Sequence, residues 1–232
     1  MANDYFQFRQ FTVHQSLCAM KVGTDGTLLG SWARGGRRVL DVGTGTGLMA
    51  LMLAQRCPEA AVVAIDIDEG AVAQAQANAE ASPFARRIEV RQADVRMLAD
   101  GKGFDAIVCN PPFFIDALTS PDDRRTLARH ACTLTYDELM LAACRLLTAD
   151  GELSVVVPFD YRCRMERAAA LAGLFLSRRC GVKTTPRKPA RRYLLAFTRH
   201  SVAATEEHTE VLEVAPGVRS AWYSELTKDF YL

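Results

Sequence analysis

The sequence predicts an α/β fold in which helices cover both faces of a mostly parallel sheet. Short apolar runs alternate with helix-favouring segments along most of the chain, and this alternation is typical of parallel sheets. Acidic or amide residues follow several of the runs, at the strand ends where ligands bind in such sheets. The chain has 232 residues, 49% of them hydrophobic, which is enough for one sizeable core.

The first half of the fold is predicted as two strands, each followed by a helix. Val39–Val42 is a short apolar run that ends in a glycine-rich turn, and Leu48–Gln55 after it is compact and helix-favouring. Val62–Ile67 has the composition of a buried strand and is closed by acidic residues. Gly70–Glu80 is rich in alanine and glutamine, which favour a helix.

The second half continues the same alternation. Ile88–Gln92 alternates as a strand does, and Phe104–Cys109 is an apolar run stopped by two prolines. Tyr136–Leu147 is an amphipathic helix, because leucine and alanine recur on one of its faces. The remaining predicted elements are a strand at Leu153–Val157, a helix at Arg164–Leu174 and a last strand at Tyr193–Phe197.

Composition narrows the functional classes. The net charge of +1 provides no global attraction to nucleic acid or membrane, so a nucleic-acid site must be a local patch. The seven cysteines include no C-x-x-C pair, so we expect reduced thiols, no metal site and a cytoplasmic protein. The apolar runs are too short to span a membrane, and Asp4 and Arg9 argue against a signal peptide.

A glycine-rich turn with three acidic residues predicts a cofactor site. Glycine at every second position of Gly43–Gly47 lets the backbone approach a ligand closely. Asp41 precedes the turn and can take a cationic ammonium. Asp66 ends the next strand and can bind ribose hydroxyls, whereas Asp94 after the third strand can accept from an adenine amino group. The alternative for Asp66 and Asp94 is helix N-capping.

The spacing of the glycines separates two cofactor classes. Nicotinamide-binding proteins use G-x-G-x-x-G/A, whereas this chain has G-x-G-x-G with Leu48 in the sixth position. The pattern D-x-G-x-G-x-G resembles the first motif of class I S-adenosylmethionine methyltransferases. That resemblance implies a Rossmann-like fold with a seven-stranded sheet that includes one antiparallel strand. The cofactor residues expected in this part of the chain are Asp41, Gly43, Thr44, Gly45, Gly47, Asp66, Ile67, Asp94, Val95 and Asn110.

The tetrapeptide Asn110-Pro111-Pro112-Phe113 predicts the acceptor site. An exocyclic amine is a poor nucleophile because its lone pair is delocalised. The Asn110 side-chain oxygen and the Pro111 carbonyl can accept the amine hydrogens and draw the lone pair out of conjugation. Phe113 offers a face on which a planar base can stack. The alternative is a stiff strand terminator.

This tetrapeptide resembles the (D/N/S)-P-P-(Y/F/W) motif of methyltransferases that act on adenine N6, cytosine N4, guanine N2 and glutamine N5. The resemblance implies a planar amine as acceptor and does not choose among these four.

The N-terminal segment narrows the family. The run from Phe11 to Trp32, with Met-Lys-Val-Gly-Thr-Asp-Gly at its centre, resembles the segment heading the bacterial tRNA1(Val) adenine-N6 methyltransferases, which modify position 37. The resemblance covers nearly the whole chain and implies that Lys21, Thr24 and Asp25 line the cofactor site. We therefore expect an N-terminal lid at residues 1–36, a methyltransferase core at 37–200 and an extension packed on the core at 201–232. The alternative for the first segment is a lid without ligand contacts.

Two basic stretches predict an RNA surface. Seven basic residues and no acidic ones lie between Arg178 and Arg192, on the acceptor side of the last strand. A second group follows the tetrapeptide. Such a run is often only a solvated loop, but clustered cations on a neutral protein fit a local RNA patch. The candidate RNA-binding residues are Arg124, Arg125, Arg129, Lys183, Arg187, Lys188, Arg191 and Arg192.

The sequence therefore predicts a monomeric enzyme that methylates N6 of an adenine in tRNA, with S-adenosyl-L-methionine as cofactor. The target base must leave its stack to enter the site. Alternatives are guanine-N2 methylation of ribosomal RNA, glutamine-N5 methylation of a release factor, and a degenerate domain that binds RNA without catalysis.

Overall fold

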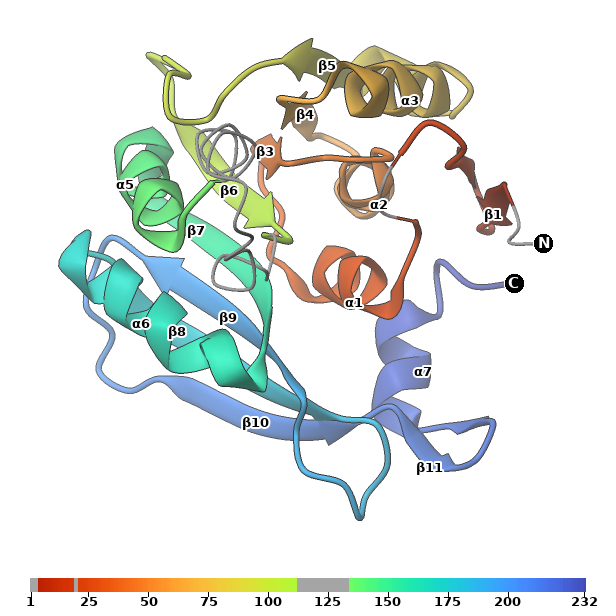
Figure 1. Ribbon diagram of the computed structural model, residues 1–232, viewed down its shortest axis with the longest axis vertical. Helices are drawn as coiled ribbons and strands as arrows, with labels where there is room; N and C mark the ends of the chain where they lie inside the picture. Colours follow the sequence, from red (N-terminus) through yellow and green to blue (C-terminus); the bar gives the residue numbers. More distant parts are fainter. Residues whose placement is uncertain (1–3, 19–20, 112–133) are drawn as a thin grey trace, which may run out of the picture.

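The computed structural model describes residues 4–18, 21–111 and 134–232. Its centre is an eight-stranded sheet with the strand order β10-β8-β9-β7-β6-β3-β4-β5 (Figure 1). All neighbouring strands are parallel except β9, which is antiparallel to both β7 and β8. The strands are β3 (Arg38–Val42), β4 (Ala61–Asp66), β5 (Ile88–Gln92), β6 (Phe104–Cys109), β7 (Leu147–Pro158), β8 (Phe175–Lys183), β9 (Arg192–Thr198) and β10 (Glu206–Val211).

The mostly parallel Rossmann-like sheet is confirmed, whereas the expected number of seven strands is wrong by one. The additional strand is β10, which pairs in parallel with β8 at the edge of the sheet. Four of its six residues, from Glu206 to Thr209, are exposed. The segment therefore lacks the apolar pattern from which a strand is predicted. Its acidic side chains face the basic ones of β8, with Glu207 opposite Arg179.

Helices cover both faces of the sheet, as predicted. Alternate residues of the central strands enter two separate cores, because successive side chains of a strand point to opposite faces. Val39 of β3 belongs to the core with α1 and α2, whereas Leu40 belongs to the core with α5 and α6. The helices are α1 (Thr24–Trp32), α2 (Leu48–Arg56), α3 (Glu69–Glu80), α5 (Tyr136–Leu146), α6 (Arg162–Leu171) and α7 (Ala221–Thr227), with short 3-10 turns η1 (Ala85–Arg87) and η2 (Phe159–Tyr161).

None of the helices in the described ranges is long and apolar enough to cross a membrane.

The two ends of the described chain lie side by side (Figure 1). An N-terminal hairpin of β1 (Tyr5–Gln7) and β2 (Thr12–His14) contacts the C-terminal segment, and the backbone N–H of Arg9 donates to the carbonyl of Phe230 at 2.8 Å. Phe230 is 1% exposed in the core that contains α1 and α2. A second hairpin, β11 (Glu213–Ala215) with β12 (Val218–Arg219), precedes α7. The domain boundaries at residues 36 and 200 stay predictions.

Candidate active site

The glycine turn after β3 has the conformation that its sequence requires. Gly43, Gly45 and Gly47 have φ of 67°, 54° and 80°, in the left-handed region that favours glycine. A side chain at Gly43 or Gly45 would meet nothing within 4 Å, so backbone conformation rather than space selects glycine there. The N–H of Gly43 donates to the carbonyl of Ile65 at 2.9 Å, and that of Gly45 donates to Asp66 Oδ2 at 2.9 Å. The turn is thereby tied to the end of β4.

Asp41 lies beneath this turn rather than in a cavity. It is fully buried, and its Oδ2 accepts the hydroxyl of Thr44 at 2.6 Å and the N–H of Ala50 at 3.1 Å. Burial, opposed by these hydrogen bonds, raises the pKa of Asp41 to about 7. The carboxyl therefore joins the turn to the start of α2. Its predicted contact with a cofactor ammonium stays a prediction.

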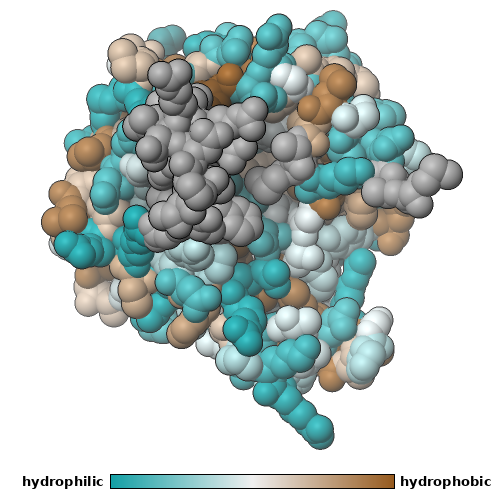
Figure 2. Space-filling view, viewed as in Figure 1, coloured by the Kyte–Doolittle hydropathy of each residue, from teal (hydrophilic) through white to brown (hydrophobic). Residues whose placement is uncertain are grey.

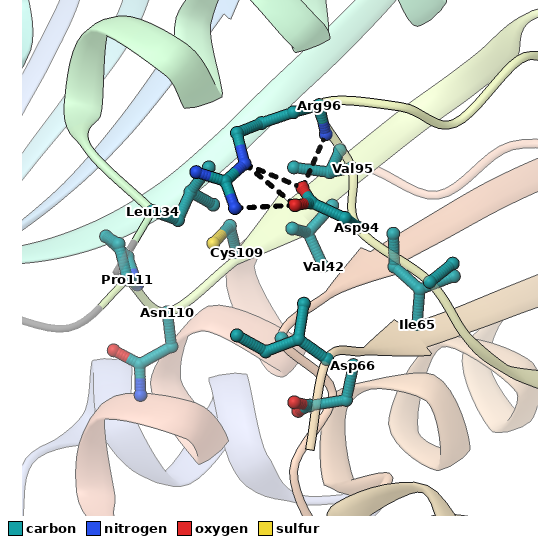
Figure 3. Close-up of a pocket in the computed structure, with 13 residues that line it drawn as sticks. Val42, Ile65, Asp66, Asp94, Val95, Arg96, Cys109, Asn110, Pro111 and Leu134 are labelled. Carbon is teal, nitrogen blue, oxygen red and sulfur yellow. Dashed lines mark hydrogen bonds and ion pairs between the residues drawn. The ribbon is translucent and has the colours of Figure 1, made fainter. Parts of the chain in front are cut away.

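Two adjoining cavities open at the carboxyl ends of the parallel strands. The first has a volume of about 260 Å³ and the second about 240 Å³, and both are lined by Gly43 and Asn110. Several predicted site residues line the first cavity (Figure 3). They are Gly43, Asp66, Ile67, Asp94, Val95, Asn110 and Pro111. Lys21, Thr24, Asp25, Thr44 and Gly45 line the second. Pro112 and Phe113 lie outside the described residues.

Asp66 lines the first cavity and does not cap the helix that follows it. Its Oδ1 accepts the N–H of Asp68 at 3.0 Å, and it lines the first cavity. The N-cap of α3 is Asp68, whose side chain accepts the N–H of Ala71 at 2.8 Å. The capping alternative for Asp66 is therefore excluded by the geometry of the turn.

Replacing Asp66 with alanine should weaken cofactor affinity by about 1.5–3 kcal/mol, since a charge-assisted hydrogen bond to ribose is lost. Titration calorimetry with S-adenosylhomocysteine measures this. Asp66→Asn tests the effect of the charge alone. It removes the negative charge, whereas its amide oxygen can still accept the hydrogen bond from the N–H of Gly45. The matched control is Asp68→Ala, which should lower stability by about 1 kcal/mol and leave affinity unchanged. Equal affinities in Asp66→Ala and wild type would contradict the assignment.

Asp94 is held by an arginine that the sequence analysis missed. The guanidinium of Arg96 donates to both carboxylate oxygens of Asp94 at 2.6–2.9 Å (Figure 3). It also donates to Glu138 at 3.2 Å. The hydrogen bond from Arg96 lowers the pKa of Asp94, so the carboxylate stays ionised. Arg96 also lines the first cavity, although no motif marks it in the sequence. The predicted bond from Asp94 to an adenine amino group stays a prediction.

Asn110 stands at the junction of the two cavities. It follows the last residue of β6, and its side-chain Oδ1 is buried with no hydrogen-bonding partner among the described residues. A buried amide oxygen without a partner is unfavourable unless a ligand satisfies it. The neighbouring Cys109 is not an alternative reactive group, because burial raises the pKa of its thiol far above neutrality. Asn110 and Cys109 therefore present an acceptor atom and no strong base.

The basic stretch from Arg178 to Arg192 is divided between structural and exposed residues. Arg178 pairs with buried Glu152 at 2.5 Å, and Arg179 pairs with Glu166 at 3.0 Å and Glu207 at 2.7 Å. These two arginines therefore lie in a strand and have acidic partners, whereas residues 184–191 of the stretch form the connection between β8 and β9.

The predicted RNA-binding residues likewise include some that are exposed and some that have partners within the protein. Arg187, Lys188 and Arg191 are exposed on the connection between β8 and β9, and Lys183 at the end of β8 donates to the Pro186 carbonyl at 3.3 Å. Arg192 instead lines the second cavity and pairs with Asp25. Arg124, Arg125 and Arg129 lie outside the described residues.

The residues of both cavities suit S-adenosylmethionine. Asp66 can hold ribose hydroxyls in the first cavity, whereas the second is lined by opposite charges and by the backbone of the glycine turn. The unpartnered Asn110 oxygen lies between them, where the methyl-bearing centre of an extended ligand would be.

Comparisons with known proteins agree with this geometry. Residues 26–176 match the model of the methyltransferase small domain family. The tRNA1(Val) (adenine(37)-N6)-methyltransferase of Bacteroides thetaiotaomicron is 46% identical, over 100% of this chain and 99% of the relative. The protein of the same description from Tolumonas auensis is 41% identical, over 100% and 98%.

Among solved structures, a predicted O-methyltransferase from Agrobacterium tumefaciens shares the fold with a TM-score of 0.69 and 20% identity, over 89% of this chain and 96% of that one. The glycine turn, the cavities and the full-length relatives together lead to one conclusion: this chain belongs to the S-adenosylmethionine-dependent methyltransferases, in the tRNA1(Val) (adenine(37)-N6)-methyltransferase family.

Proposed function

We propose that this chain transfers a methyl group from S-adenosylmethionine to N6 of adenine 37 in tRNA1(Val). The observation that carries the proposal is the buried, unpartnered oxygen of Asn110 at the junction of the cofactor cavities. The full-length relatives described as tRNA1(Val) (adenine(37)-N6)-methyltransferases support the choice of adenine over guanine or glutamine.

The proposed mechanism combines positioning with electrostatics. Asn110 Oδ1 and the Pro111 carbonyl accept the two amine hydrogens, which draws the nitrogen lone pair out of the plane of the base. The cofactor supplies an electrophilic methyl group on a sulfonium. No strong base is needed, because the nitrogen proton becomes acidic once the nitrogen carries the new methyl group.

The test is methylation of purified substrates followed by mass spectrometry of the products. A tRNA1(Val) transcript should yield N6-methyladenosine, and the matched transcript with guanine at position 37 should yield none. Ribosomal RNA and a release factor serve as the competing substrates. Methylation of guanine N2 or of a glutamine side chain, with no product from tRNA, would contradict the proposal.

We further propose that RNA phosphates contact the hairpin connection formed by Arg187, Lys188 and Arg191. Hydrophilic side chains project from the molecule at this connection between β8 and β9 (Figure 2). The connection ends beside the second cavity, because its last residue, Arg191, directly precedes the cavity residue Arg192. This places the cations within reach of an RNA whose target base is in the site. A monomeric, cytoplasmic enzyme stays a prediction.

Neutralising Arg187, Lys188 and Arg191 together should weaken tRNA binding and flatten its salt dependence. Three lost phosphate contacts should reduce the slope of log affinity against log salt by about 2–3 units. Filter binding of whole tRNA across a salt series measures the slope. The control replaces three exposed cations at the amino ends of parallel strands, away from the carboxyl ends where the cavities open. They precede β3, β5 and β6 and are Arg37, Arg86 and Lys102. Equal slopes for both triple variants would show that RNA binds elsewhere.

A further inference from the structure

An aromatic pair, Phe159 and Tyr193, lies at the edge of the sheet where the cavities open. Phe159 directly follows the last residue of β7, and its side chain is 50% exposed. The ring centroid of Tyr193, the second residue of β9, lies 6.1 Å from that of Phe159. Since β7 is parallel to β6, Phe159 and Asn110 follow their strands at the same edge.

Contacts within the protein hold this pair in place. The backbone N–H of Phe159 donates to the carbonyl of Arg191 at 3.0 Å, which ties the end of β7 to the connection between β8 and β9 (Figure 1). Tyr193 packs partly against the core that contains α5 and α6, and the guanidinium of Arg162 lies over its ring at 5.2 Å. Tyr193 therefore supports the pair, and Phe159 is its exposed surface.

The neighbouring connection supplies positive charge. Residues 184–192 contain four basic residues and no acidic one, and Arg187, Lys188 and Arg191 are exposed. Cations attract the phosphates of a nucleic acid, whereas the flat faces of aromatic rings stack on unpaired bases. Exposed cations beside an exposed ring are the combination that binds single-stranded RNA, and an anticodon loop is single-stranded.

The strand register indicates which base the ring would meet. Cys109 of β6 pairs with Val155 of β7. Asn110 is one residue beyond this register and Phe159 is four residues beyond it. The offset of three residues is about 10 Å at about 3.3 Å per residue, whereas the centroids of interacting rings are about 4.5–7 Å apart. The position of Phe159 therefore fits a nucleotide beside the target base better than the target base itself.

We propose that Phe159, supported by Tyr193, stacks on the base next to the adenine that is methylated. The inference rests on tRNA being the substrate. The target base must leave its stack to reach Asn110, and this costs free energy. Stacking of the neighbouring base on Phe159 offsets part of that cost and holds the loop in register with the cavities. Phe159 is thus a positioning residue.

The test uses anticodon stem-loops that carry 2-aminopurine, whose fluorescence is quenched by stacking, at position 36, 37 or 38. In the saturated complex, the probe at 36 or at 38 should be brighter with Phe159→Ala than with wild type, and the probe at 37 should be unchanged. Filter binding should show affinity lower by about 5- to 100-fold. The slope of log affinity against log salt should not change, because the ring carries no charge.

Two variants serve as controls. Phe175→Ala removes a ring that is 44% exposed at the start of β8, at the opposite edge of the sheet, and should change neither fluorescence nor RNA affinity. Phe159→Trp keeps a stacking face and should retain the quenching and the affinity. The affinity of Phe159→Ala for S-adenosylhomocysteine should stay within about twofold of wild type, since Phe159 lines neither cavity.

Three outcomes would overturn the proposal. The first is unchanged fluorescence at positions 36 and 38 in Phe159→Ala. The second is a change confined to the probe at 37, which would assign Phe159 to the target base. The third is a parallel loss of affinity for RNA and S-adenosylhomocysteine, with no recovery in Phe159→Trp, which would show that the ring is only structural.

Failure of this inference is distinguishable from failure of the proposed function. Methylation of adenine 37 by a wild-type enzyme, with no effect of Phe159→Ala on the probes, would overturn only the stacking. The expected fluorescence pattern in an enzyme that leaves adenine 37 unmethylated would uphold the RNA contact of Phe159 and contradict only the proposed substrate.

Discussion

Replacing Asn110 with alanine is expected to lower kcat for adenine methylation by about 10²–10³-fold, with cofactor affinity nearly unchanged. The reason is that Oδ1 interacts with the acceptor amine mainly as the nitrogen loses conjugation, in the transition state. The oxygen has no hydrogen-bonding partner among the described residues, so accepting from the amine breaks no existing hydrogen bond. Single-turnover rates with tRNA and calorimetry with S-adenosylhomocysteine measure the two quantities.

Asn110→Asp is the matched variant for this test. It keeps an acceptor oxygen in the same place, and aspartate is one of the residues that the motif accepts, so kcat should be much less reduced than in Asn110→Ala. A normal kcat in Asn110→Ala would contradict the mechanism. Equal losses of rate and cofactor affinity would show that Asn110 acts in cofactor binding instead.

The pH dependence of stability is expected to change strongly when Asp41 becomes asparagine. Burial raises the pKa of Asp41 from its ordinary value of 3.8 to about 7 in the folded protein. Between these values the unfolded chain has released this proton and the folded chain still holds it, so rising pH favours unfolding. The loss of unfolding free energy caused by this shift is absent below about pH 4. It grows by about 1.4 kcal/mol per pH unit and reaches about 4 kcal/mol near pH 7.

Asp41→Asn removes this titration and keeps an oxygen that can accept from Thr44 and Ala50. Its free energy of unfolding in urea, relative to wild type, should therefore rise from pH 4 to pH 7 and then stay level. Taking the difference between the two proteins cancels the titration of other groups. Parallel profiles for wild type and Asp41→Asn would show that Asp41 is ionised at neutral pH.

Local sequence determined the part of the site that depends on backbone conformation. The glycines at 43, 45 and 47 have left-handed φ values, and the asparagine before two prolines directly follows a strand. Because the carboxyl ends of parallel strands meet at one edge of a sheet, the alternation of elements also placed Asp66, Asp94 and Asn110 along the same wall. Each of these features is a property of a few consecutive residues.

Contacts between distant residues decided the rest. The edge strand β10 has no apolar pattern of its own and is specified by pairing with β8, where Glu207 neutralises Arg179. The same pairing gives Arg179, a member of the basic stretch, a partner within the protein. Charge patterns along a chain carry no information about which partner a side chain meets across a fold.

The two cavities also combine features set by local sequence with features set by contacts between distant residues. The sequence by itself determined the family, the glycine turn and the acceptor asparagine. Only the tertiary structure brought Arg192 to Asp25, 167 positions away in sequence, and brought Arg96 of the first cavity to Glu138 of α5. The physical reason is that an ion pair has no sequence period: it forms wherever packing brings opposite charges into a place that water only partly reaches.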